Sequence, residues 1–536
     1  MTEQGGSVVA GGDAGVRRGA LATLGARGMR AIPWLVPLVV FVVALRAVDY
    51  YPVGVAYDDA VYVELAKSLA TGHGYRYLHL PGTPFATHYP PGYPFFLSLL
   101  WRAWPDFPGN VLLFKVANAV LVALIAVGLA RWARERFELP PGQAAMAALV
   151  ASLGIPTLIL SALVMSETLF VAMLLAALIL GERVVGGERR AGWLVGAGVV
   201  GGMTTLVRMQ GVAVLGAVVL LLMFRRRFRD AAWYAGGAGL LVVPWQWWVA
   251  AHAGAIAGPL QSTFGPYFPW WLQAMRDGGV GFFLSTVAAT THLIALQFAI
   301  ALQPIFVWGA GIVGFLVALV VAGVGAWRAR QVAPVTLGFL AIYFGLIIIW
   351  PYPPGRFVWG IWPLAVMLVL LGLRALVRRE VPGWLARRGR AGLLVAALIP
   401  VLGYARYTVR GYSGAWWTAI PRGTGPQLRA QVLTARADTV PGTVFATTYD
   451  VPIYLYSGHQ AVLSSPLSAG NFLHPTAVDQ GVQELREVLK AYPVTRVIAM
   501  WGPQVEVARL LAAAHPPELA LTDSFPDGLI YSTIRE

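Results

Sequence analysis

The sequence predicts an α-helical polytopic membrane protein of about 11 transmembrane helices, followed by a small C-terminal α/β domain. Of its 536 residues, 57% are hydrophobic and only 12% are charged. That balance is too apolar for a soluble protein of this length. Apolar segments long enough to cross a hydrocarbon core of about 30 Å recur as far as residue 405, with arginine clusters at every second connection.

The transmembrane domain is expected to cover residues 32–405. Residues 1–31 are polar and Gly-rich and are expected to be cytoplasmic and disordered. The first apolar segment is interpreted as a retained span because no small-residue cleavage site follows it. Residues 251–296 leave two alternatives open, interfacial helices or an additional span. The predicted spans are 32–49, 110–131, 142–160, 167–182, 191–207, 211–224, 231–250, 297–326, 333–350, 357–373 and 391–405.

Arginine clusters predict the orientation, because Lys and Arg are retained on the cytoplasmic side of a membrane. They precede the first span and recur in connections such as "RWARER" from Arg131 and "RRRFR" from Arg225. The net charge of +15 therefore reflects topology, and a nucleic-acid partner is not expected. An odd number of spans starting in the cytoplasm places residues 406–536 outside. The chain has no cysteine, so disulfides and thiolate metal sites are excluded.

Residues 406–536 form the predicted extracytoplasmic α/β domain. "GTVFATTYDVPIYLYSG" and "VTRVIAMWG" have the composition of strands, "VQELREVLKAY" is typical of an amphipathic helix, and "LALTDSFPDGLIYSTI" favours a hairpin. The first of these stretches could contact a sugar or could simply be a strand packed within the domain. Its candidate side chains are Asp450, Tyr454, Tyr456 and His459.

An acidic pair follows the first span, in "AYDDAVYVELAKSL". Asp58 and Asp59 lie in the predicted extracytoplasmic loop near residues 50–109, here called the first loop. Asp58 shares a helical face with Tyr62, Leu65 and Leu69, so an acid would stand above an apolar stripe at the membrane surface. Asp58 could cap the helix, or it could be functional, because carboxylates are costly near hydrocarbon.

Five stretches resemble the polytopic GT-C glycosyltransferases, in particular the bacterial relatives of protein mannosyltransferases and aminoarabinose transferases. The resemblance extends over roughly residues 32–375 and is carried by "AYDDAVYVELAKSLATGHGYR", "HYPPGYPFFLSLLW", "SALVMSETLF", "TTLVRMQG" and "PYPPGRFVWGIWPL". It implies a catalytic acid in the first loop, where Asp58 occupies the matching position. Asp59 stands where relatives often have Glu, so which of the two acids acts stays open.

The resemblance also implies a polyprenyl-phosphate sugar donor and the bacterial plasma membrane, since nucleotide sugars are confined to the cytoplasm. A departing lipid phosphate needs fixed cations. Arg208 and Arg356 are the main candidates because they stand apart from the cytoplasmic clusters, although either could merely snorkel to the interface. Arg76 and His88 are further candidates. Relatives often place Lys before the Pro-Pro pair, whereas this chain has "THYPPGYP".

Glu167, in "MSETLF", is a second intramembrane acid at a position where relatives place an acid near the cavity. It could orient the acceptor, pair with Arg208, hold a metal or simply favour the start of a helix. A divalent metal could be held by carboxylates and a histidine, but the spacing does not require one. The residues concerned are Asp58, Asp59, Glu167 and His88.

The predicted reaction is a single inverting displacement in which Asp58 acts as general base toward an acceptor hydroxyl. The acceptor could be a lipid, a glycan or a protein. Two alternatives remain, a transporter or flippase of lipid-linked sugars, and a non-catalytic protein that only binds polyprenyl lipid.

Overall fold

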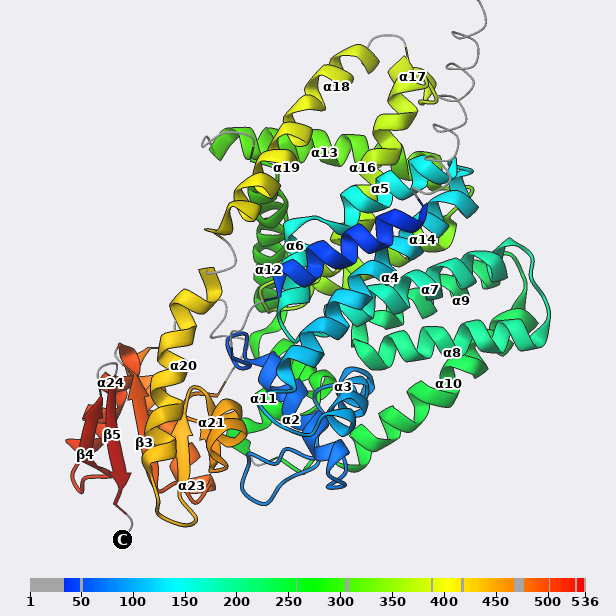
Figure 1. Cartoon of the computed structure of the whole chain (residues 1–536). Helices are drawn as coiled ribbons and strands as arrows, with labels where there is room; N and C mark the ends of the chain where they lie inside the picture. Colours follow the sequence, from blue (N-terminus) through cyan, green and yellow to red (C-terminus); the bar gives the residue numbers. More distant parts are fainter. Residues whose placement is uncertain are drawn as a thin grey trace, which may run out of the picture.

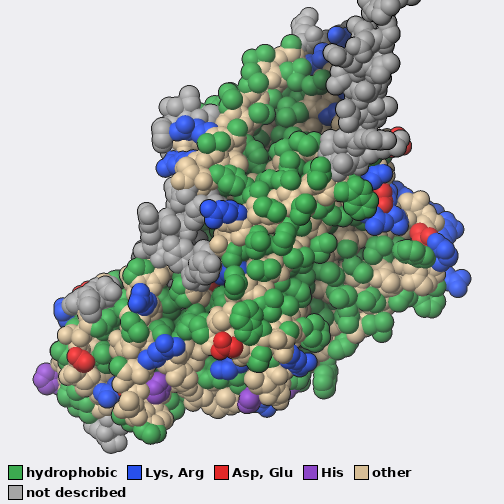
Figure 2. All heavy atoms as spheres, viewed as in Figure 1, with side chains coloured by type: hydrophobic (Ala, Val, Ile, Leu, Met, Phe, Trp, Pro, Cys, Tyr) green, Lys and Arg blue, Asp and Glu red, His purple; other side chains and the backbone are tan. Residues whose placement is uncertain are grey.

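The computed structural model describes residues 33–48, 52–256, 258–303, 308–386, 389–415, 419–466, 477–500, 502–525 and 528–534. A helical bundle makes up most of it, and a domain built on a β-sheet lies at one end of that bundle (Figure 1). A broad area of hydrophobic side chains covers the visible face of the bundle (Figure 2). The N-terminal segment predicted to be disordered, residues 1–31, lies outside the described residues.

Most helices of the bundle lie within or close to the predicted apolar segments. In the part of the chain that the structure describes, five helices are long and apolar enough to cross a membrane, or six if the bent pair α5 and α6 is one span. The count of eleven spans stays a prediction. The helices are Pro33–Ala47, α4 (Val111–Phe137), α5 (Pro141–Ser152), α6 (Ile155–Ala162), α7 (Glu167–Gly186), α8 (Ala191–Val207), α9 (Val212–Phe224), α10 (Phe228–Ala251), α12 (Tyr267–Ala301), α13 (Trp308–Ala329), α14 (Pro334–Ile348), α15 (Gly355–Gly360), α16 (Trp362–Val377), α18 (Arg390–Ala396) and α19 (Leu398–Arg410).

The predicted span 297–326 is wrong as a single helix. One helix, α12, ends at Ala301, and the next, α13, begins at Trp308. The sequence places Pro304 between them, and a proline cannot donate the backbone hydrogen bond that a helix interior needs. Helix α12 begins at Tyr267 but is broken at Gly279, whose φ of 57° and ψ of −157° are not helical, so two helical segments occupy much of the region for which two alternatives were open.

The first loop carries two helices, α2 (Asp58–Ala70) and α3 (Gly92–Ala103), which pack against each other. Helix α2 lies where a helix was predicted, but it is not amphipathic in its surroundings, because nine of its thirteen residues are buried. Helix α3 covers it within the loop, and the C-terminal domain covers it through α21 (Asp450–Ser457). The short elements η2 (Gly258–Leu260) and α11 (Gln261–Phe264) lead from α10 toward α12.

The C-terminal domain contains a five-stranded mixed sheet of order β2-β1-β3-β5-β4. Strand β1 is parallel to both β2 and β3, and β5 is antiparallel to β3 and β4. The predicted amphipathic helix is α23, and the predicted hairpin is β4 with β5. The elements are α20 (Ala419–Ala437), β1 (Val444–Thr447), β2 (Gln460–Leu463), α23 (Val478–Ala491), β3 (Arg496–Met500), α24 (Pro503–Ala512), β4 (Leu519–Phe525) and β5 (Gly528–Thr533).

One predicted strand of this domain is only half correct. The stretch "GTVFATTYDVPIYLYSG" forms the short strand β1 and then the helix α21. Pro452 lies in the first turn of α21, where the missing N–H is not needed and the fixed φ favours a helix. Helix α21 lies beside α2 (Figure 1), so the domain sits directly on the first loop.

Candidate active site

Asp58 is the first residue of α2 and follows a strained turn. The preceding residue, Tyr57, has φ 62° and ψ −65°, and the Asp58 N–H donates to the Ala56 carbonyl at 2.8 Å, which closes a γ-turn. A non-glycine residue in such a conformation costs about 1–3 kcal/mol and is typical of functional sites. No side chain caps this helix, so the capping alternative for Asp58 is not what the structure shows.

Both carboxylate oxygens of Asp58 are engaged. Oδ2 forms an ion pair with Arg356 Nη2 at 2.5 Å, and Oδ1 accepts a hydrogen bond from the Tyr89 hydroxyl at 2.7 Å. Burial by itself raises the pKa of Asp58, but the Arg356 guanidinium and then the Tyr89 hydroxyl outweigh it and hold this pKa below its usual value. Asp58 is therefore a carboxylate at neutral pH. Its side chain is still 18% exposed.

A cavity of about 420 Å³ brings Asp58, Arg208 and Arg356 together. These three residues come from α2, from the end of α8 and from α15, which lie far apart in the sequence. The walls are mostly apolar and aromatic, with three tyrosines near the charged groups. The lining residues are Asp58, Tyr62, Tyr89, Pro90, Val207, Arg208, Met209, Gln210, Val212, Tyr267, Phe268, Trp271, Leu346, Ile347, Ile349, Trp350, Arg356 and Phe357.

Asp59 points away from this cavity, into the backbone that precedes α2. Its side chain is 2% exposed, and its carboxylate accepts hydrogen bonds from the N–H groups of Gly54, Ala56 and Ala60 at 2.9, 3.2 and 3.1 Å. Burial raises the pKa of Asp59 to about 6, against the lowering effect of these hydrogen bonds. Of the two adjacent acids, only Asp58 lines the cavity.

Glu167 stands behind the cavity wall and pairs with Arg208. Its Oε1 lies 2.8 Å from Arg208 Nη1, and the exposed fractions of the two side chains are 1% and 9%. Arg208 also donates to Ser166 Oγ at 2.9 Å, and Ser166 donates to the Tyr62 hydroxyl at 3.0 Å. Among the roles considered for Glu167, the structure contains the pairing with Arg208.

Arg76 and His88 do not line this cavity. The Arg76 guanidinium lies 3.7 Å from the centre of the Phe85 ring and donates to the Thr83 carbonyl. His88 donates from Nδ1 to the Gly265 carbonyl at 2.7 Å. Burial lowers the pKa of His88 to about 4, so its imidazole is neutral and offers no cation. Both residues belong to the first loop, but they contact other residues than those of the cavity. Arg76 pairs with Phe85 where the loop folds back on itself.

Tyr89, Tyr267 and Trp350 are cavity residues that sequence reasoning missed. Tyr89 lies directly before the Pro-Pro pair, and its hydroxyl donates a hydrogen bond to Asp58. Tyr267 and Trp350 are uncharged, and single aromatic residues do not stand out in a sequence with 20 Trp and 20 Tyr. Within the described ranges, no group of three or more His, Asp or Glu side chains is arranged to hold a metal ion.

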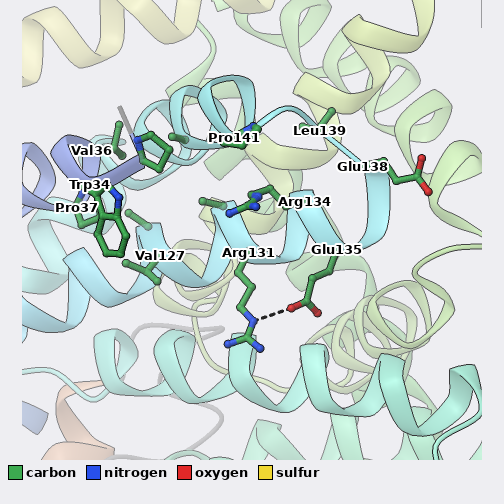
Figure 3. A pocket seen from close by; sticks show the side chains of 14 residues that line it. Trp34, Val36, Pro37, Val127, Arg131, Arg134, Glu135, Glu138, Leu139 and Pro141 are labelled. Atoms are coloured by element: carbon green, nitrogen blue, oxygen red, sulfur yellow. Dashed lines mark hydrogen bonds and ion pairs between the residues drawn. The ribbon is translucent and has the colours of Figure 1, made fainter. Parts of the chain in front are cut away.

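A second cavity, of about 680 Å³, lies between the helix Pro33–Ala47, α4 and α5 (Figure 3). In this view Arg131 is directed at Glu135, and the two form an ion pair at 2.7 Å. Its lining includes no residue that the sequence predicted to be catalytic or to bind the donor. The candidate active site is therefore the cavity at Asp58.

A family match covers part of the chain. Residues 88–248 match the sequence profile of the family described as dolichyl-phosphate-mannose-protein mannosyltransferase. This segment includes Glu167 and Arg208 but neither Asp58 nor Arg356. A search of curated protein sequences found no match.

Solved structures match nearly the whole chain. ArnT from Cupriavidus metallidurans bound to undecaprenyl phosphate is 15% identical, with a TM-score of 0.54 over 95% of this chain and 98% of that one. The oligosaccharyltransferase of Archaeoglobus fulgidus is similar too. Its complex with zinc and sulfate is 14% identical, with a TM-score of 0.51 over 93% of this chain and 73% of that one. The oligosaccharyltransferase AglB of Archaeoglobus fulgidus in complex with an inhibitory peptide and a dolichol-phosphate is 13% identical, with a TM-score of 0.51 over 87% of this chain and 69% of that one.

Proposed function

We infer that this chain, a glycosyltransferase of the GT-C type by its fold and its matched segment, transfers a sugar from a polyprenyl-phosphate donor to an acceptor hydroxyl. The observation that carries the proposal is the meeting of one carboxylate, Asp58, with two guanidinium groups, Arg208 and Arg356, in one cavity. Transfer from a lipid phosphate needs both kinds of group, a base for the attacking hydroxyl and cations for the leaving phosphate.

In the proposed step, the acceptor oxygen attacks C1 of the sugar while its proton passes to a carboxylate oxygen of Asp58. The bond between C1 and the phosphate oxygen breaks, and the electron pair leaves with the lipid phosphate. Arg356 and Arg208 stabilise the negative charge that develops there. A single displacement inverts the anomeric centre, and one carboxylate is sufficient for it.

Arg356 links the two events of this step, proton transfer to Asp58 and departure of the lipid phosphate. Its guanidinium forms an ion pair with Asp58 at 2.5 Å. A donor phosphate would compete for the same guanidinium, because a carboxylate and a phosphate bind it in the same way. Withdrawal of Arg356 from Asp58 would raise the pKa of that carboxylate, so donor binding would make Asp58 a stronger base when the acceptor needs one.

The apolar walls of the cavity support a lipid donor. Phe268, Trp271, Leu346 and Trp350 line it beside the charged groups, and such a surface suits an isoprenoid chain better than a nucleotide. ArnT and AglB have been solved with undecaprenyl phosphate and with a dolichol-phosphate respectively. We further propose that the reaction occurs on the extracytoplasmic face of a bacterial plasma membrane, with the N-terminus in the cytoplasm and residues 406–536 outside.

The test measures cleavage of the bond between C1 of the sugar and the phosphate oxygen of the donor. The purified protein is reconstituted in liposomes with a radiolabelled polyprenyl-phosphate sugar and a native envelope fraction as the source of acceptors. We expect free polyprenyl phosphate and a labelled product of inverted anomeric configuration to form together. A flippase would instead move the intact donor between leaflets, and a protein that only binds lipid would leave the donor uncleaved and in place; either result contradicts the proposal.

A further inference from the structure

The backbone that precedes Asp58 is held by the C-terminal domain. Gly54, with φ 114°, packs so closely against α21 that a Cβ atom at this position would lie 2.5 Å from Pro452 Cγ. The next contact is a hydrogen bond, which the Val53 N–H donates to the Tyr456 hydroxyl at 2.9 Å. Both partner residues, Pro452 and Tyr456, belong to α21. One face of this helix thus contacts the segment Val53–Asp59 directly.

The strained residue of the turn is also influenced by the charge of this helix. Burial raises the pKa of Tyr57, and the Asp450 carboxylate raises it further, so the Tyr57 hydroxyl stays protonated. Asp59 holds the other side of the same segment through its hydrogen bonds to three backbone N–H groups. The γ-turn that points Asp58 into the cavity is therefore held between α2 and α21.

A buried charged contact fixes the distance between these two helices. His79 Nδ1 lies 2.9 Å from Glu64 Oε1 on α2, and its Nε2 lies 3.4 Å from Asp450 Oδ2 on α21. All three side chains are fully buried. The His79 carbonyl also accepts a hydrogen bond at 2.9 Å from Ala461 in strand β2. These contacts of one histidine link α2, α21 and β2.

We propose that the C-terminal domain is a positioning element for the reaction, and that its helix α21 holds the strained turn at Tyr57 so that Asp58 points at the acceptor hydroxyl. The proposal rests on the proposed function, in which Asp58 is the base. Tyr456, Asp450 and Asp59 then act through Asp58 as positioning residues and do not touch the substrate. The predicted contacts of Asp450 and Tyr456 with a sugar are replaced by contacts with the first loop.

A pair of matched variants on α21 tests this role. Tyr456→Phe removes the acceptor of the Val53 N–H, whereas Tyr454→Phe makes the same change on a ring that contacts Lys67 without a hydrogen bond to the turn. Because small displacements of a reacting group are costly, we expect Tyr456→Phe to lower kcat about tenfold at an unchanged donor KM. Tyr454→Phe should keep the wild-type kcat. A wild-type kcat in Tyr456→Phe, or a changed KM alone, would overturn the proposal.

A rescue experiment separates positioning from a general loss of folding. Gly54→Ala introduces the Cβ that meets Pro452, and we expect it to lower kcat while binding of undecaprenyl phosphate is retained. Pro452→Ala in the same chain removes the Cγ atom that is met, and should restore part of the lost kcat. Because the φ of 114° strains any side chain at this position, only the part of kcat that Pro452→Ala restores is assigned to packing against α21, and a wild-type kcat in Gly54→Ala alone would overturn the proposal.

Asp58→Asn in the same assay separates the two proposals. If Asp58→Asn is inactive while Tyr456→Phe and Gly54→Ala keep the wild-type kcat, the proposed function stands and the positioning role fails. If Asp58→Asn keeps the wild-type kcat, the proposed function itself fails, whatever the variants on α21 do.

Discussion

Two ion pairs at the candidate active site join a carboxylate to an arginine, but in different surroundings. The pair of Glu167 and Arg208 is almost completely buried, with exposed fractions of 1% and 9%. The pair of Asp58 and Arg356 opens into the cavity, with exposed fractions of 18% and 39%. Both distances are short, at 2.8 and 2.5 Å. Geometry alone does not distinguish them.

Exposure decides what each pair can do. A buried pair cannot lose one partner without leaving an uncompensated charge, so Glu167 and Arg208 are expected to stay paired and to keep one cation fixed at the cavity wall. A pair that reaches solvent is worth little to stability, and its members can exchange partners with a ligand. Asp58 and Arg356 are therefore the groups expected to rearrange during the reaction.

The largest effect is expected from breaking the buried pair. Glu167→Ala leaves Arg208 buried without its carboxylate and should lower the free energy of unfolding by about 3–5 kcal/mol. Asp58→Ala, the matched change in the open pair, should lower it by no more than about 1 kcal/mol. Thermal unfolding in detergent compares the two variants. Equal losses of unfolding free energy in the two variants would contradict the conclusion that exposure distinguishes the two ion pairs.

The second prediction concerns the cation of the open pair. Arg356→Gln should lower kcat by about 10²- to 10³-fold, because a fixed charge that stabilises the leaving phosphate is lost. Its melting temperature should stay close to that of the wild type. Steady-state transfer assays give kcat, and the same samples give the unfolding curve. A wild-type kcat would exclude Arg356 from phosphate stabilisation.

A smaller effect is expected from the buried contact between the first loop and the C-terminal domain. Burial lowers the pKa of His79, but Glu64 and then Asp450 outweigh it and raise this pKa to about 9. Because the folded pKa is above the ordinary value of about 6.5, the stability that the charged His79 contributes is fully present below about pH 6.5 and is lost as the pH rises through about 9. That contribution is at most about 3 kcal/mol. Melting temperatures at pH 6 and pH 9.5 should differ more for the wild type than for His79→Gln, and parallel curves would contradict this.

The smallest effect is expected at Arg76, a candidate that the structure places away from the cavity. Its guanidinium packs on Phe85 and donates to Thr83, both within the first loop. Substitutions away from a buried or reacting group usually change energies by about 0.5 kcal/mol or less. Arg76→Gln should therefore leave the donor KM within about threefold of the wild type. A donor KM clearly above that threefold limit would restore Arg76 as a phosphate ligand.

The sequence predicts the charged members of the cavity better than its shape. Arg208 and Arg356 stand out because they interrupt apolar surroundings, and Asp58 stands out because an acid beside a span is costly. Adjacent residues on a helix point about 100° apart, since a turn takes 3.6 residues. Asp58 and Asp59 therefore had to differ in role. Which one faces the cavity depends on the γ-turn at Tyr57, which no sequence pattern indicates.

Tertiary packing decided the remaining features. Arg76 and His88 share the first loop with Asp58, but loop residues carry no periodicity that would predict their direction. The sequence predicts a strand where α21 lies, because β-branched and aromatic residues favour strands, and the burial of this helix against the first loop overrides that preference. The fold of the bundle was predictable because apolar length is a strong signal, whereas the break between α12 and α13 depends on one short segment.

The central claim is that Asp58 is the base of the transfer reaction. A single-turnover assay with purified protein and a bound polyprenyl-phosphate sugar tests it most directly, comparing Asp58→Asn with Asp106→Asn, an exposed acid elsewhere in the first loop. We expect Asp58→Asn to bind the donor but to transfer the sugar about 10²- to 10⁴-fold more slowly, and Asp106→Asn to react at the wild-type rate. Transfer by Asp58→Asn at the wild-type rate would contradict it.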